Sequence, residues 1–137
     1  MICLEGKTIG LRNSELLIII PAYNESGNIE KTIKMIEEHT PEFDYVIIND
    51  CSTDHTLEIC RNNNFNVIDL PINLGIGGAV QTGYQYAVKN GYQYAVQVDG
   101  DGQHNPEFIR KMLQVLQEKN VNMVIGSRFI ENQGFQS

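Results

Sequence analysis

The chain has 137 residues, of which 42% are hydrophobic and 12 are glycine, a length that suits one compact domain. A formal net charge of −7, with 10 Lys and Arg residues in all, excludes the basic face that nucleic-acid binding requires. We therefore predict a single domain over residues 1–137 with no nucleic-acid partner, in which residues 1–15 show no clear periodicity and form a leader of uncertain structure.

The cysteines and the apolar runs indicate the compartment. The three cysteines, Cys3, Cys51 and Cys60, are odd in number and lack C-x-x-C spacing, which argues against a disulfide framework and a zinc site. No apolar run approaches ~18 residues and no signal-peptide pattern is present. We expect a cytoplasmic location, with any membrane association arising through segments beyond Ser137.

Two strand–helix units open the ordered part of the chain. The apolar run at 16–20, closed by Pro21, is typical of a strand buried on both faces. Asn28 then fits the cap of a helix with a buried face formed by Ile29, Ile33 and Ile36. Residues 45–48 repeat the strand pattern, and the next helix carries Leu57, Ile59 and Cys60.

The alternation continues through the middle of the chain. Residues 65–70 predict a third strand, closed by Pro71. Residues 73–78 open a helix that ends at residues 90–91, and its predicted buried face contains Ala79, Val80, Gly83, Tyr84, Ala87 and Val88.

A fourth strand begins at Tyr94 and ends directly before Asp99. Residues 105–107, with sequence Asn-Pro-Glu, predict a helix start, and residues 122–125 a fifth strand. This βαβα alternation predicts an α/β fold with a mostly parallel open sheet and helices on both faces.

Polar residues gather at three predicted strand ends, at 21–25, 49–54 and 99–104. The carboxyl ends of parallel strands lie along one edge of a sheet, where open α/β proteins bind their ligands. The three clusters are therefore expected to converge on one crevice.

Asp99 and Asp101 flank a glycine at the end of the fourth strand. One interpretation is a plain turn, because Asp and Gly are common turn residues. The other is a site for Mg²⁺ or Mn²⁺, to which Gln103 adds an oxygen. A calcium loop is excluded because His104 and Arg110 stand where its glycine and bidentate Glu belong.

Several candidates keep two interpretations. Asp50 fits a contact to a base or ribose, or a cap for the helix after Asp54. Residues 75–78 resemble part of a dinucleotide fingerprint, but they also suit a helix start that needs no ligand. His104 fits a metal ligand, a substrate contact or a polar residue before a helix cap. Glu25 is the main titratable group of its cluster, although its spacing does not indicate a general base.

Taken together, residues 17–25, 46–54, 73–79 and 97–104 resemble the family 2 glycosyltransferases of the GT-A fold, a Rossmann-like nucleotide-binding architecture. The nearest members in character are the polyprenyl- and dolichyl-phosphate sugar synthases. The resemblance implies a metal-dependent enzyme that transfers a sugar, with inversion, from a UDP- or GDP-sugar to a lipid-phosphate or saccharide acceptor.

The resemblance also implies roles for residues of the first two clusters. Pro21, Tyr23 and Glu25 resemble the residues that embrace the nucleobase, and Asp50 resembles the carboxylate that contacts the base or ribose. Two departures are Asn49, where an Asp is common, and Cys51, where a Gly is common. Neither change removes a proposed ligand.

In the third cluster, Asp99, Gly100 and Asp101 resemble the family's D-x-D motif. Asp99 is implied near the ribose and as a further metal contact, and Asp101 as the residue that binds the metal on the diphosphate. Gln103 is similar to another metal ligand, and Arg128 belongs to a segment similar to one that meets the acceptor phosphate.

The family's acceptor half, with any catalytic base, lies beyond the part that this chain matches. We therefore expect residues 1–137 alone to be the donor-binding portion of a catalytic domain, with bound nucleotide and little turnover. The alternative is a non-catalytic nucleotide-binding or receiver-type signalling module. A receiver would have paired acids after its first strand, where this chain has Pro21 and Ala22.

Overall fold

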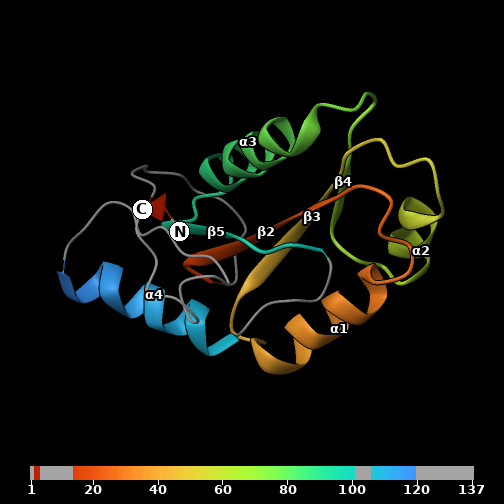
Figure 1. The fold of residues 1–137 in the computed structure, drawn as a ribbon. Helices are drawn as coiled ribbons and strands as arrows, with labels where there is room; N and C mark the ends of the chain where they lie inside the picture. Colours follow the sequence, from red (N-terminus) through yellow and green to blue (C-terminus); the bar gives the residue numbers. More distant parts are fainter. Residues whose placement is uncertain (1, 4–13, 101–105, 120–137) are drawn as a thin grey trace, which may run out of the picture.

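The computed structural model describes residues 2–3, 14–100 and 106–119. This part of the chain forms one five-stranded sheet with helices on both faces (Figure 1). The elements in chain order are β1 (Ile2–Cys3), β2 (Leu16–Ala22), α1 (Ile29–His39), β3 (Asp44–Asn49), α2 (Thr56–Asn62), β4 (Val67–Asp69), α3 (Gly75–Lys89), β5 (Tyr94–Gln97) and α4 (Pro106–Lys119).

The sheet has the strand order β1-β5-β2-β3-β4. Strand β2 pairs in parallel with β3 and β5, and β3 pairs in parallel with β4. Strand β1 pairs antiparallel with β5. The α/β class and the mostly parallel sheet predicted from the sequence are confirmed.

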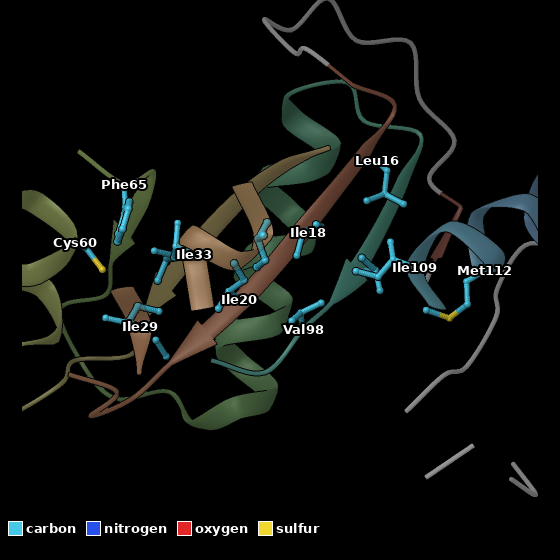
Figure 2. Packing of buried hydrophobic residues seen from close by; sticks show 14 of the residues in the cluster. Leu16, Ile18, Ile20, Ile29, Ile33, Cys60, Phe65, Val98, Ile109 and Met112 are labelled. Carbon is cyan, nitrogen blue, oxygen red and sulfur yellow. The ribbon is translucent and has the colours of Figure 1, made fainter. Parts of the chain in front are cut away.

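The central strand β2 is buried on both faces, as its unbroken apolar run predicts. All five residues from Leu16 to Ile20 are 0% exposed. Leu16, Ile18 and Ile20 pack with apolar residues of α1, α2 and α4, as Figure 2 shows for Ile29, Ile33, Cys60, Ile109 and Met112. Each such side chain contributes roughly 1.5–3 kcal/mol through burial.

Of the described helices, α3 alone covers the opposite face of the sheet, on which Leu17 and Ile19 lie (Figure 1). Its buried residues are small: Ala79, Gly83 and Ala87. A methyl group at Gly83 would collide with the Ile19 side chain, so the glycine allows the helix to lie close to β2. Val88, predicted on this buried face, is instead 44% exposed, because the small residues form the contact line.

Three local predictions need correction. The leader contains β1, a strand of 2 residues that its antiparallel pairing with β5 creates. The third predicted strand shrinks to Val67–Asp69. Asn28 occupies the N-cap position of α1 but makes no side-chain cap hydrogen bond. The strand predicted at 122–125 and residue 105 lie outside the described residues.

Two further features bear on the chemistry of the chain. Burial raises the pKa of the Cys60 thiol to about 11, so this residue stays protonated and serves the core. None of the described helices is long and apolar enough to cross a membrane.

Candidate functional site

A cavity of about 330 Å³ opens at the carboxyl-end edge of the sheet. Its walls come from the ends of β2, β3 and β5 and from the first turns of α3. The lining residues are Pro21, Ala22, Tyr23, Glu25, Asp50, Ile76, Ala79, Asp99 and Gly100. The predicted convergence of the three polar clusters is therefore present for the described parts of all three.

All of the predicted donor-site residues that lie within the described chain line this cavity. They are Pro21, Tyr23, Glu25, Asp50, Asp99 and Gly100. Asp101, Gln103, His104 and Arg128 fall outside the described residues, so the proposed metal and acceptor-phosphate contacts stay predictions.

The loop after β2 is fixed by Asn24, which has a left-handed backbone with φ 55°. Its side-chain Oδ1 accepts hydrogen bonds from the backbone N–H of Thr53 at 2.8 Å and of Asp54 at 3.3 Å. Its own N–H donates to Ser52 Oγ at 3.0 Å. The loops after β2 and β3 thus hold each other, which positions the cavity residues on either side of Asn24.

Asp54 strengthens the same connection between loops. Its carboxylate accepts hydrogen bonds from the backbone N–H groups of Ser26 at 3.1 Å and Thr56 at 2.9 Å, and the Glu25 N–H donates to Thr56 Oγ1 at 2.9 Å. Burial alone would raise the pKa of Asp54, but the hydrogen bonds from Thr56 and Ser26 outweigh it and lower the pKa to about 2. Asp54 is therefore ionised near neutral pH and holds the loop after β2 to the start of α2.

Asp50 follows β3 and is only 3% exposed. Its Oδ1 accepts a hydrogen bond from the Leu74 N–H at 2.7 Å, and its carbonyl accepts one from Asn73 Nδ2 at 3.1 Å. The interpretation of Asp50 as a cap for the helix after Asp54 is wrong, because the carboxylate instead holds the start of α3. This contact fixes the Asp50 side chain at the cavity.

The glycines that open α3 have structural reasons. Gly75 has φ 79°, a left-handed conformation that favours glycine. A methyl group at Gly78 would lie 2.6 Å from Leu74 Cβ. The helix-start interpretation of residues 75–78 therefore accounts for these two glycines.

The same helix start supplies cavity residues that the sequence analysis missed, Ile76 and Ala79. A usable signal existed, because a helix that follows a parallel strand must begin at the carboxyl-end edge. Ile76 is 63% exposed and, like Tyr23, which is 48% exposed, adds exposed apolar surface to the cavity lining.

The end of β5 lies against the end of β2. A methyl group at Gly100 would lie 3.4 Å from both Glu25 Cγ and the Pro21 carbonyl oxygen. Asp99, directly before it, is exposed at the cavity, and Gln97 Nε2 donates to its Oδ1 at 3.5 Å. The third cluster thus meets the first through backbone and side-chain packing.

The described lining of the cavity is acidic. It contains the carboxyl groups of Glu25, Asp50 and Asp99 and no lysine, arginine or histidine. A diphosphate placed here would require a cation to offset the repulsion. The described residues contain no group of three or more His, Cys, Asp or Glu side chains arranged to hold a metal ion.

The sequence matches a known protein family. Residues 17–137 match the model of the family described as Glycosyl transferase family 2. The UDP-N-acetylglucosamine–dolichyl-phosphate N-acetylglucosaminyltransferase of Methanococcus voltae is 32% identical over 89% of this chain and 55% of its own length. The undecaprenyl-phosphate mannosyltransferase of Micrococcus luteus is 30% identical over 82% of this chain and 48% of its own length.

A solved structure shares the fold. The mannosyltransferase from Pyrobaculum calidifontis, in complex with GDP-Man and Mn²⁺, matches with a TM-score of 0.65 and 19% identity over 81% of this chain and 34% of its own. The chain spans about half the length of the curated relatives that it matches. The shared fold agrees with the GT-A architecture that the resemblance predicted. Because the family model matches residues 17–137, the chain belongs to glycosyl transferase family 2.

Proposed function

We propose that this chain is the donor-binding portion of a metal-dependent glycosyltransferase that uses a UDP- or GDP-sugar. The observation that carries the proposal is that residues from three strand ends line one and the same cavity. They are Tyr23, Glu25, Asp50 and Asp99. A cavity of about 330 Å³ is of the size that holds a small-molecule ligand.

The described residues suit the nucleoside part of such a donor. Tyr23 and Ile76 offer exposed apolar surface for a planar base. Asp50 and Glu25 offer carboxylate oxygens to the N–H groups of a base or the hydroxyls of a ribose. Asp99, two residues after β5, would accept hydrogen bonds from the ribose hydroxyls.

The acidic lining supports the metal dependence. Carboxylate oxygens are the ligands that Mg²⁺ and Mn²⁺ prefer, and Asp99 is of that type. We propose that Asp101 and Gln103 join it in holding the ion, which would neutralise the diphosphate as the nucleotide leaves. The P. calidifontis mannosyltransferase, solved with GDP-Man and Mn²⁺, supports the choice of ion.

The proposed acceptor is a lipid phosphate or a saccharide. The names of the M. luteus and M. voltae relatives contain undecaprenyl-phosphate and dolichyl-phosphate, which favours the lipid phosphate. An acceptor oxygen would attack the anomeric carbon from the face opposite the nucleotide, form the new C–O bond as the bond to the diphosphate breaks, and so invert the carbon. An ionised phosphate needs no base for this step, and we propose that Arg128 binds it.

Calorimetric titration tests this proposal. We expect UDP or GDP to bind this chain more tightly with Mn²⁺ than without it. The change Asp101→Ala should remove the difference between the two conditions, since it deletes the proposed metal ligand. Glu38→Ala, which removes an exposed carboxylate near the end of α1, is the matched control and should keep the Mn²⁺ dependence.

Two outcomes would contradict different parts of the proposal. Mn²⁺ dependence that persists in Asp101→Ala would exclude the metal role of that residue. Failure of the unaltered chain to bind either nucleotide, with or without the metal ion, would exclude donor binding itself.

A further inference from the structure

Asp99 lies between two fixed points of the backbone. On one side, the N–H of Val98, the residue after β5, donates to the Ile19 carbonyl of β2 at 2.9 Å. On the other side, the Gly100 carbonyl accepts a hydrogen bond from Thr32 Oγ1 of α1 at 3.1 Å. The Asp99 carboxylate therefore projects from a short span of chain, residues 98–100, whose backbone is hydrogen-bonded at both ends.

The hydroxyl of Thr32 donates its hydrogen bond to an acceptor outside α1. The backbone N–H of Thr32 donates to the Asn28 carbonyl, as a helical residue should. A helical threonine commonly directs its hydroxyl to a carbonyl in the preceding turn. Thr40, the C-cap residue of α1, makes the same kind of bond, since its Oγ1 donates to the Ile36 carbonyl at 2.8 Å. Thr32 instead donates to a carbonyl 68 positions away, in the turn after β5.

The hydrogen bond between Thr32 and the Gly100 carbonyl lies in a buried place, where water cannot readily replace it. Thr32 is 0% exposed, and Gly100 is buried against Glu25 and Pro21. Water has little access to a carbonyl in such a place, so its bond to Thr32 is costly to lose. Without it, the hydrogen bonds that hold the span carrying Asp99 would, among the described residues, be those of the pairing between β5 and β2.

We propose that Thr32 is a positioning residue for donor binding, which acts through the Gly100 carbonyl to fix Asp99 at the cavity. This role rests on the proposed function, because it presumes that a nucleotide occupies the cavity. It goes beyond that function by placing one determinant of nucleotide affinity in the buried face of α1, outside the cavity.

Calorimetry with UDP and GDP in the presence of Mn²⁺ tests the role. Thr32→Val keeps the side-chain shape and removes the donor, and it should raise the Kd of the bound nucleotide about tenfold, as the loss of one hydrogen bond predicts. Thr32→Ser retains a hydroxyl and should restore most of the affinity. Thr40→Val removes an equally buried threonine hydroxyl at the C-cap of α1 and should leave the Kd unchanged.

A double-mutant cycle separates positioning from general destabilisation. If Thr32 acts through Asp99, Thr32→Val should have little further effect on the Kd in an Asp99→Ala background. Additive effects of the two changes would overturn the proposed route. If Thr32→Val does not fold, Thr32→Ala at reduced temperature removes the same hydroxyl without placing a methyl group against the Gly100 carbonyl, and it is judged by the same cycle.

The outcomes distinguish this role from the function on which it rests. If the unaltered chain binds neither nucleotide, the donor-binding function and the role of Thr32 both fail. If it binds and Thr32→Val has the same Kd as Thr40→Val, the role of Thr32 alone is overturned.

Discussion

The two sides of the cavity are built in different ways. The loops after β2 and β3 are fastened to each other through Asn24 and Asp54, each of which accepts more than one hydrogen bond from the facing loop or from α2. The end of β5 is held by pairing with β2 and by the hydroxyl of Thr32.

This difference indicates how the proposed site divides its tasks. The β2–β3 side, which carries Tyr23, Glu25 and Asp50, is preorganised by a network, so the loss of a single bond should cost stability but leave the positions of these side chains in place. The β5 side, which carries Asp99, makes fewer hydrogen bonds among the described residues and should respond strongly to the loss of one. The stability of the chain should therefore follow the first side, and nucleotide affinity the second.

The largest effect on the β2–β3 side is expected from Asn49→Asp. Asn49 is 1% exposed, and its Nδ2 donates to Asp69 Oδ1 at 2.9 Å. A carboxylate in its place would face that of Asp69, so we expect a loss of about 2 kcal/mol in the free energy of unfolding near neutral pH. Urea titration measures it.

The control for this change is the exchange variant Asn49→Asp with Asp69→Asn, which again sets an amide against a carboxylate and should recover most of the stability. The like charge would raise the pKa of the new carboxyl group above its unfolded value, so the destabilisation should shrink as the pH falls. A loss that is the same at every pH would show that the two carboxylates are not its cause.

A smaller effect on the same side is expected at Asp54. Its pKa is lowered from 3.8 to about 2 in the folded chain, so its contribution is present above the unfolded pKa and is lost as the pH falls from about 4 to about 2. Because Asp54 is only partly buried and solvent screens its interactions, we expect only about 1 kcal/mol. Asp54→Asn should unfold more easily at pH 7 and show a flatter acid dependence, both followed by thermal melting in parallel with the unaltered chain.

Much of the fold was predictable, because buried strands of a parallel sheet have unbroken apolar runs. Residues 16–20 and 45–48 predicted β2 and β3 within a few positions. Strand β1 was not predictable, since 2 residues contain no pattern and become a strand only through pairing with β5. The exposure of Val88 was missed because a helical face defined by hydrophobicity does not reveal that glycine and alanine make the closest contact.

The site residues likewise divide into those that a sequence pattern predicts and those that only tertiary contacts reveal. Its polar members were predictable because the ends of parallel strands share an edge, and those within the described chain do line one cavity. Asp50 kept two interpretations, since no local signal identifies the Leu74 N–H as its partner. The contact of Thr32 with Gly100 joins residues 68 positions apart, and a lone threonine within a helix gives no sign of it.

The smallest effect is expected at Cys51, the second departure from the family pattern. Cys51 has φ 58°, a conformation that costs a non-glycine residue roughly 1–2 kcal/mol. Cys51→Gly removes that strain but adds freedom to the unfolded chain and loses the contact of Sγ with the Pro71 carbonyl at 3.7 Å, so we expect a net gain of about 0.5 kcal/mol. Cys51→Ala, which keeps the strain, is the control and should give no gain in urea titration. If the two-sided construction of the cavity is correct, neither change should alter the Kd for nucleotide, because the network around Asn24 and Asp54 holds this loop whether or not its turn is relaxed.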